Sequence, residues 1–225
     1  MKTIDIAAGS VRELNQALHD QAEHCSEREF VVTNPKGAHN IACGLDASVA
    51  VDIHGHAGYF CAGMNKSASV TVHGNAGPGL AENMMSGSVR VKGDASAAAG
   101  ATAHGGLLVI DGNAGSRCGI SLKGADIVVG GNVGHMSCFM AQAGTLVVCG
   151  DAGEALGDSL YETRIYVKGS VKSLGADCVE KEMREEHLTE LTELLNRAGF
   201  DDNPADFKRY GSARELYNFK IDNAY

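Results

Sequence analysis

The sequence is poor in aromatic residues, in basic residues relative to acidic ones, and in long apolar runs. Aromatic residues make up 5% of the 225 residues, and 19 lysines and arginines stand against 28 aspartates and glutamates, for a net charge of −9. An acidic balance argues against binding to nucleic acid, because backbone binding depends on basic patches. No apolar run approaches the roughly 20 residues of a membrane-spanning helix, so no membrane insertion is expected.

Targeting and metal-binding signals are also missing. Residues 1–5 lack the apolar stretch of a signal peptide. None of the seven cysteines forms a C-x-x-C pair, which argues against a zinc or iron–sulfur site built by local spacing. An odd number of cysteines without a secretion signal indicates reduced thiols. We therefore expect a cytoplasmic chain that holds no metal.

Glycine is abundant, with 29 residues, and seven of these glycines recur at an interval of nineteen residues. Each follows an alternation such as Val51-x-Ile53 and precedes a mostly polar residue, usually Asn or Asp, and then Ala or Val. Self-similarity at a fixed period is the signature of a solenoid. The repeat glycines are Gly55, Gly74, Gly93, Gly112, Gly131, Gly150 and Gly169.

The period and the alternation predict the kind of solenoid. Side chains alternate between the two faces of a strand, so the positions four and two before each glycine, and two after it, point inward. Nineteen does not fit hexapeptide helices, and the leucine-rich and calcium-binding repeat motifs are absent. We predict an all-β, right-handed parallel β-helix of about seven coils over residues 49–174. The glycines are expected to allow a sharp corner or a positive φ, and their Asn and Asp neighbours to form Asx turns.

The chain divides into three segments: an N-terminal cap with a helix over 1–30, the β-helix over 31–175, and a C-terminal helix with a partner-docking tail over 176–225. Val32 lies nineteen residues before Val51 and marks an irregular entry coil. Ser10 and Glu13 form a capping-box pattern that predicts a helix over 11–24. A second helix is predicted over 180–198, ended by Gly199. The inward face of the first helix is expected to hold Val11, Leu14, Leu18 and Ala22.

An outward stripe lies three positions before each repeat glycine. It is polar in the first three coils and apolar in the next four. A contiguous apolar stripe on an outer face indicates that something packs on it. Two coverings stay open, the chain's own second helix or a partner subunit. We predict that residues of this stripe and aromatic residues of the tail form the partner interface. These residues are Val109, Val128, Val147, Tyr166, Phe207, Tyr210, Tyr217 and Phe219.

The repeated element, as in residues 72–77 (Val-His-Gly-Asn-Ala-Gly) and 129–134 (Val-Gly-Gly-Asn-Val-Gly), resembles the GXGXG domain. That domain forms the C-terminal β-helix of the glutamate synthase large subunit, and formylmethanofuran dehydrogenase has a similar subunit. The chain size and the ending over residues 209–219 most resemble the β-helix subunit of N-methylglutamate synthase, a methylamine–glutamate N-methyltransferase.

The resemblance implies a non-catalytic scaffold subunit in a cytoplasmic hetero-oligomer. Its partners would be an amidotransferase-like subunit and an FMN-binding glutamate synthase-like subunit, and the complex would convert glutamate and methylamine to N-methylglutamate and ammonia. FMN and an iron–sulfur cluster would lie on a partner, while this chain would bind no cofactor and carry no catalytic residue. The alternatives are a β-helix subunit of glutamate synthase proper or of a formylmethanofuran dehydrogenase-like complex. A polysaccharide-acting β-helix is disfavoured, because the outward residues Asp52, Thr71, Arg90 and Val109 form no charged cluster.

Overall fold

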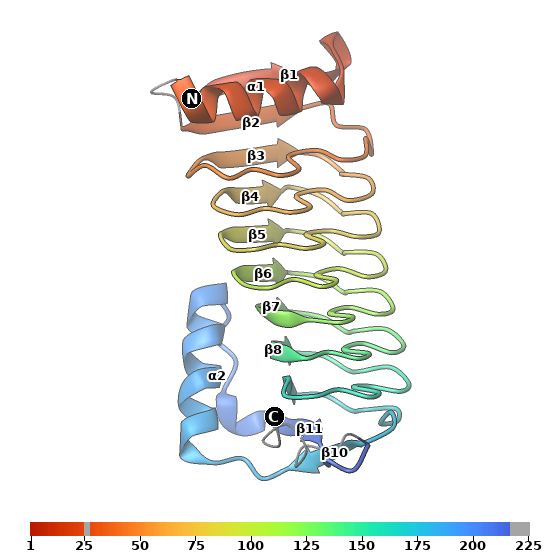
Figure 1. Cartoon of the computed structure of the whole chain (residues 1–225). Helices are drawn as coiled ribbons and strands as arrows, with labels where there is room; N and C mark the ends of the chain where they lie inside the picture. The colour runs from red at the N-terminus through yellow and green to blue at the C-terminus, as the bar shows by residue number, and fades with distance from the viewer. Residues whose placement is uncertain (25–27, 217–225) are drawn as a thin grey trace, which may run out of the picture.

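The computed structural model describes residues 1–24 and 28–216, with the side chains of 21–24 excepted, and shows a stack of coils between two end structures (Figure 1). One sheet runs the length of the stack in the order β1-β2-β3-β4-β5-β6-β7-β8-β9-β11-β10. The elements are β1 (Lys2–Asp5), η1 (Ile6–Ala8), α1 (Val11–His24), β2 (Glu29–Thr33), β3 (Ala50–His54), β4 (Ser69–Val72), β5 (Ser88–Val91), β6 (Leu107–Ile110), β7 (Lys123–Val129), β8 (Ala143–Val148), β9 (Arg164–Val167), β10 (Cys178–Lys181), α2 (Glu185–Ala198), η2 (Pro204–Asp206) and β11 (Lys208–Ser212).

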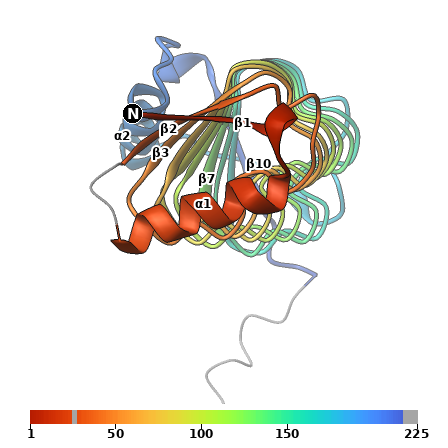
Figure 2. The same ribbon diagram turned by 90° about the horizontal axis from the view of Figure 1, so that it is seen from above.

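The strands from β3 to β9 pair in parallel with an offset of nineteen residues, apart from one register shift between Lys123 and Asp126 in β7, which confirms the predicted β-helix of about seven coils. Val51 pairs with Val70, and Val70 with Val89. Seen from above, the coils lie almost on top of one another (Figure 2). The entry coil differs from the sequence-based expectation, because Phe30 rather than Val32 pairs with Val51, which makes this coil two residues longer.

The interior of the coils is filled by the predicted columns of small and branched side chains. The column four residues before each glycine, from Val51 to Ile165, is at most 1% exposed, and Ala114, two residues after Gly112, is 4% exposed. Isolated parallel bridges join this second column from coil to coil, as between Ala95 and Ala114. Burial of one continuous apolar core along the stack is the main favourable term for such a fold.

The repeat glycines are required by close contact between coils and not by backbone dihedral angles. Of the seven, Gly55 has a positive φ of 139°, and the other six do not. A Cβ on Gly74 would lie 2.7 Å from the carbonyl oxygen of Gly55, and a Cβ on Gly112 would lie 2.8 Å from that of Gly93. Of the two expected reasons for glycine, a sharp corner or a positive φ, the positive φ applies to Gly55 alone, and at Gly74 and Gly112 the neighbouring coil leaves no room for a side chain.

The Asn and Asp residues that follow these glycines form a hydrogen-bonded ladder along the stack. The Oδ1 atom of Asn75 accepts from the backbone N–H of Asp94 at 3.0 Å, and Asp94 accepts in turn from Asn113 at 2.7 Å. The ladder begins where His56 Nδ1 accepts from Asn75, and it ends where Asp151 accepts from Ser170. These side chains join neighbouring coils, so the predicted local Asx turns are replaced by contacts nineteen residues apart.

The turns opposite the sheet contain residues in the left-handed backbone region, a feature that the sequence did not indicate. In the first regular coil these are Phe60, Ala62 and Met64, with φ between 54° and 58°. Their N–H groups donate alternately to the coil on either side, from Phe60 to Pro78 at 2.9 Å and from Ala62 to Ile41 at 2.9 Å. Such a conformation is uncommon for residues other than glycine, and here the inter-coil hydrogen bonds hold it.

The first end of the stack is covered by α1 and β1. The predicted helix and its capping box are confirmed, since Ser10 and Glu13 exchange hydrogen bonds and Leu14 and Leu18 are buried; the Ala22 side chain lies outside the described residues. The side chain of Asn15 donates to Asn40 O at 2.7 Å and accepts from Ala42 N at 2.9 Å. It thereby satisfies backbone groups that would otherwise form an open edge.

Gly112→Ala should destabilise the protein by about 1–3 kcal/mol, because the new methyl group would meet Asp94 Oδ1 and the backbone of Gly93. Gly211→Ala is the matched control, since its Cβ would find its nearest neighbour at 3.6 Å, an ordinary contact. Urea unfolding of both variants measures the difference. Equal midpoints would show that the coils separate readily to admit a side chain.

Candidate functional site

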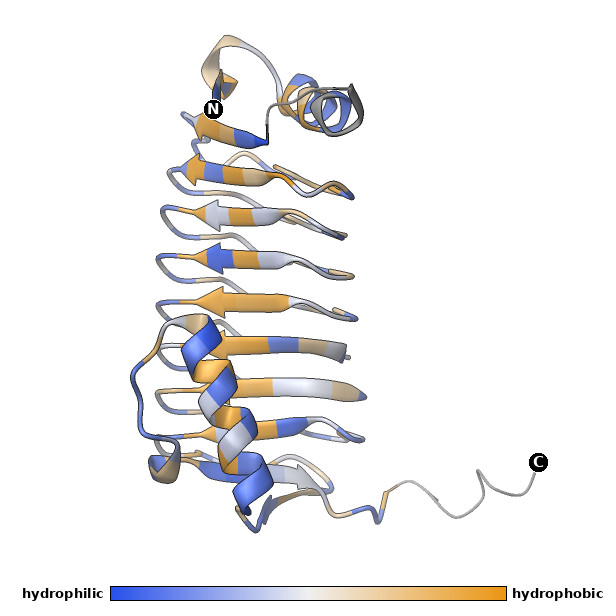
Figure 3. Ribbon diagram, turned by 90° about the vertical axis from the view of Figure 1, so that its left-hand side faces the viewer, coloured by the Kyte–Doolittle hydropathy of each residue, from blue (hydrophilic) through white to orange (hydrophobic). Residues whose placement is uncertain are grey.

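The apolar outward stripe is covered by the chain's own helix α2. Val128, Val147 and Tyr166 are 0% exposed, and Val109 is 4% exposed. They form a second core with α2 and Phe207, and Figure 3 shows α2 lying across the apolar strands of the later coils. The prediction that this stripe forms a partner interface is therefore corrected: the apolar face of α2 occupies it. That face consists of Leu191, Leu194, Leu195 and Ala198.

Polar contacts fix both ends of α2 on the coils. Near its start, the Tyr166 hydroxyl donates to Glu190 Oε2 at 2.7 Å, and Arg164 pairs with the same carboxylate at 2.6 Å. At its end, Arg90 Nη1 donates to the carbonyl of Ala198 at 2.9 Å, where a cation favours the negative end of the helix dipole. Burial and the bond to Glu190 raise the pKa of Tyr166, which keeps this hydroxyl protonated as a donor.

The segment after α2 returns to the sheet instead of forming a free tail. Strand β11 lies antiparallel between β9 and β10, with Tyr210 opposite both Ile165 and Glu180. Phe207 and Tyr210 are 4% and 5% exposed, because one packs beneath α2 and the other against the coil interior. Both residues therefore belong to the core and are not interface anchors, and the expected docking tail is corrected for residues 201–216.

Two other sequence-based expectations for this end have different outcomes. The second helix begins at Glu185 rather than at residue 180, because residues 180 and 181 belong to β10, while Gly199 ends the helix with a φ of 74° as predicted. Tyr217 and Phe219 lie outside the described residues, so their assignment to a partner interface stays a prediction.

The histidine and cysteine side chains form no metal-ligand cluster within residues 1–24 and 28–216. The rings of His54 and His73 lie with their centroids 4.8 Å apart and are tilted by 60°, and His73 Nε2 lies 2.7 Å from Asp52 Oδ1. Cys118 is fully buried, and this burial raises the pKa of its thiol to about 12. A buried thiol with a raised pKa is a poor nucleophile, which agrees with a structural role.

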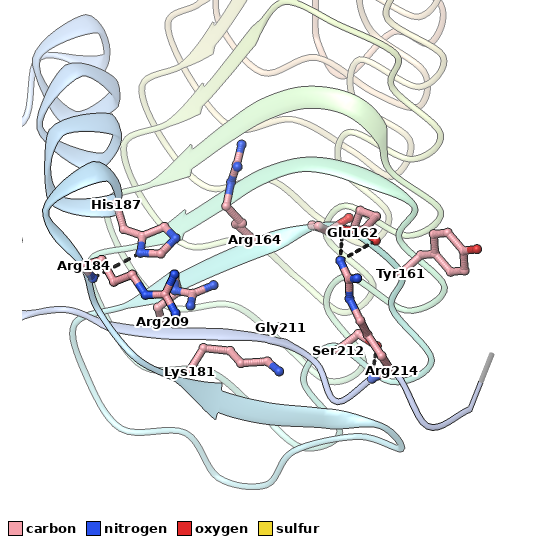
Figure 4. Close-up of a pocket in the computed structure, with 11 residues that line it drawn as sticks. Tyr161, Glu162, Arg164, Lys181, Arg184, His187, Arg209, Gly211, Ser212 and Arg214 are labelled. Carbon is pink, nitrogen blue, oxygen red and sulfur yellow. Dashed lines mark hydrogen bonds and ion pairs between the residues drawn. The ribbon is translucent and has the colours of Figure 1, made fainter. Parts of the chain in front are cut away.

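A basic cavity of about 350 Å³ lies at the C-terminal end of the stack (Figure 4). Strand β11 forms its floor, with β10 and the start of α2 around it. Five lysine and arginine side chains and His187 line the cavity, against a single carboxylate, Glu162. The lining cations are Arg164, Lys181, Arg184, Arg209 and Arg214.

Some cations of the cavity are paired with a carboxylate, and others are not. Arg214 forms two bonds to the carboxylate of Glu162, at 2.8 and 2.9 Å, and Arg184 pairs with Glu182 at 3.0 Å. Arg209 donates instead to the backbone carbonyl of Glu182, at 3.0 Å from Nε and 2.8 Å from Nη2. Burial, and repulsion from Arg184 and Arg164, lower the pKa of Arg209. Positive charge therefore accumulates here on a chain whose net charge is −9.

Sequence reasoning missed this cavity because its residues come from separate segments. Arg164 begins β9, Lys181 ends β10, Arg184 precedes α2, and Arg209 lies on β11. The antiparallel return of β11 sets Arg209 opposite Lys181, and nothing in the nineteen-residue pattern foretells that pairing. The sequence offered no clear signal, because the arginines and lysines after residue 160 are accompanied by a larger number of aspartates and glutamates.

Comparison with known proteins identifies the family. The GXGXG motif family matches residues 31–197, which include the coils and nearly all of α2. The chain belongs to the GXGXG family. This GXGXG protein is also similar to Protein GlxC of Rhizobium meliloti (strain 1021), with 62% identity over 225 residues, covering 100% of this chain and 99% of the relative. The family that the repeated motif predicted is thus confirmed.

The GXGXG protein has no helix, within its described residues, that is long and apolar enough to cross a membrane. Both of its α-helices have fourteen residues, and each lies against the stack.

Leu191→Ala should lower the free energy of unfolding by about 2–5 kcal/mol, because Leu191 is fully buried between α2 and the apolar stripe. Glu193→Ala, an exposed position on the same helix, should change it by at most about 0.5 kcal/mol. Thermal and urea unfolding provide the measurement. If both variants were equally stable, α2 would not depend on this contact.

Proposed function

We propose that this chain is a structural subunit of a glutamate synthase-like, FMN-dependent complex, and within that class of N-methylglutamate synthase. The observation that carries the proposal is the GXGXG match over residues 31–197, since the motif resembles the β-helix domain of the glutamate synthase large subunit. The choice of N-methylglutamate synthase within that class is supported by the chain size and by the sequence of residues 209–219. In this role the chain holds the amidotransferase-like and FMN-binding subunits together.

The architecture of the stack supports a role as a rigid spacer between the partner subunits. Each regular coil is joined to the next by strand pairing, by the Asn and Asp ladder and by the hydrogen bonds of the left-handed turns. A stack tied at three places around its circumference resists bending, so it can keep two partner sites at a fixed separation. FMN and an iron–sulfur cluster belong, in this proposal, to the partner subunits.

Partner contacts must lie outside the stripe that α2 covers. Exposed apolar side chains of the described residues include Tyr59 and Phe60 on one turn, at 48% and 44%, and Met64 nearby at 57%. Aromatic residues and methionine are enriched at protein interfaces. We propose this turn as one contact surface and retain Tyr217 and Phe219 as the other.

The proposal is tested by expressing the chain together with amidotransferase-like and FMN-barrel subunits and purifying the complex through this chain. We expect stoichiometric flavin absorbance and formation of N-methylglutamate from glutamate and methylamine, with release of ammonia. A flavin-containing complex that makes glutamate but not N-methylglutamate would indicate glutamate synthase proper. A molybdenum or tungsten pterin in place of flavin would indicate a formylmethanofuran dehydrogenase-like complex.

A chain ending at residue 216 should unfold at the same temperature as the full chain but lose copurification with a partner, because it lacks Tyr217 and Phe219 and keeps β11. A chain ending at residue 200 is the informative contrast. It loses the strand between β9 and β10 and the Phe207 contact beneath α2, so its melting temperature should fall. Full retention of both partners by the chain ending at 216 would contradict the docking role of 217–225.

A further inference from the structure

We propose that the basic cavity between β9, β10, β11 and α2 binds a small oxyanion that carries two or more carboxylate or phosphate groups. This site is separate from the proposed partner contact at Tyr59 and Phe60, and it does not depend on the identity of the complex. It is a property of this chain alone.

The positions of the side chains suit an elongated anion. In Figure 4, Arg184, His187 and Arg209 lie together on one side of the cavity, and Arg214 lies on the other, beside Ser212. Lys181 lies between these two groups, while Arg164 extends away from them and pairs with Glu190. A ligand with two separated anionic groups can contact both sides at once, which a monovalent ion cannot do.

Two cations of the cavity have no carboxylate partner within the described part of the chain. These are Lys181, which forms no ion pair there, and Arg209, whose guanidinium donates to the backbone carbonyl of Glu182. Arg209 lies close enough to Arg184 and Arg164 to be repelled by both, and Glu186 offsets part of this repulsion without forming an ion pair with Arg209. Partly buried like charges are unfavourable unless an opposite charge is placed among them. An anion in the cavity would remove this repulsion and gain charge-assisted hydrogen bonds.

One residue of the cavity wall has a buried hydroxyl without a hydrogen-bond partner among the described residues. Thr163 lines the cavity, is 2% exposed, and its Oγ1 has no hydrogen-bond partner among the described residues. Buried polar groups are almost always hydrogen-bonded, because leaving one unpaired costs about 1–3 kcal/mol. The Oγ1 atom itself is closed off from the cavity, so a bound ligand would not contact it in this structure, and the proposal rests on the cations.

The chemical class follows from the donors and the volume. Planar guanidinium groups match the geometry of carboxylate and phosphate oxygens, and a lysine ammonium adds a point charge. A volume of about 350 Å³ falls in the range of small-molecule sites and admits a compact metabolite rather than a protein segment. Gly211 on the floor has no side chain to occupy this space.

The test is isothermal titration calorimetry of the full chain with citrate and with pyrophosphate as probes, at fixed ionic strength. We expect saturable one-to-one binding of at least one probe, and the stronger probe distinguishes a carboxylate from a phosphate ligand. Lys181→Gln should weaken that binding about tenfold, as loss of a charge-assisted hydrogen bond does, and Lys181→Glu should abolish it.

Lys208→Gln and Lys208→Glu are the matched controls. Lys208 lies next to Arg209 on β11, is exposed, pairs with Glu180 outside the cavity, and carries the same charge. These variants should bind the probe as the unaltered chain does. Absence of saturable binding, or equal weakening by the Lys181 and Lys208 substitutions, would overturn the proposal. Binding of a hexaglutamate peptide but of neither small anion would overturn it in favour of an acidic protein segment.

Discussion

Backbone contact between successive coils at the glycine column is the constraint on which the rest of the structure depends. Because a Cβ at Gly74 or Gly112 would lie within 2.7 or 2.8 Å of the carbonyl of the preceding coil, the coils approach closely at these points only if no side chain intervenes. The same approach brings Asn75 Oδ1 within reach of the Asp94 N–H, so the ladder follows from it. A constant offset of nineteen residues then places every apolar column in register.

The sequence was sufficient for the parts of the structure that repeat or that carry a local signal. The interval between glycines predicted the stack and its interior, and Ser10 with Glu13 predicted the start of α1. Strands β1 and β11 escaped prediction because each has four or five residues and pairs with a segment distant in sequence. The left-handed Phe60 and Met64 escaped it because inter-coil hydrogen bonds, not the type of residue, hold their conformation.

The candidate sites also include one feature that the sequence indicated and one that it did not. The change from polar Arg90 to apolar Val109 and Val128 correctly indicated a covered surface, yet it could not distinguish a helix of the same chain from a partner. The basic cavity could not be predicted at all, because Lys181 and Arg209 meet through an antiparallel pairing outside the repeat. Its position at one end of the stack leaves those sides of the coils that α2 does not cover available for protein contacts.

The insertion of β11 between β9 and β10 has a consequence for the order in which the chain assembles. Coils formed by consecutive residues can stack as soon as each leaves the ribosome, from β3 onward. Strand β10, although made earlier, reaches its place in the sheet only through β11, which follows α2 in the sequence. Until residues 208–212 emerge, the growing face at β9 has no cover. Closure of that face therefore waits for β11, and a chain cut short before β11 would expose an edge that can recruit another copy.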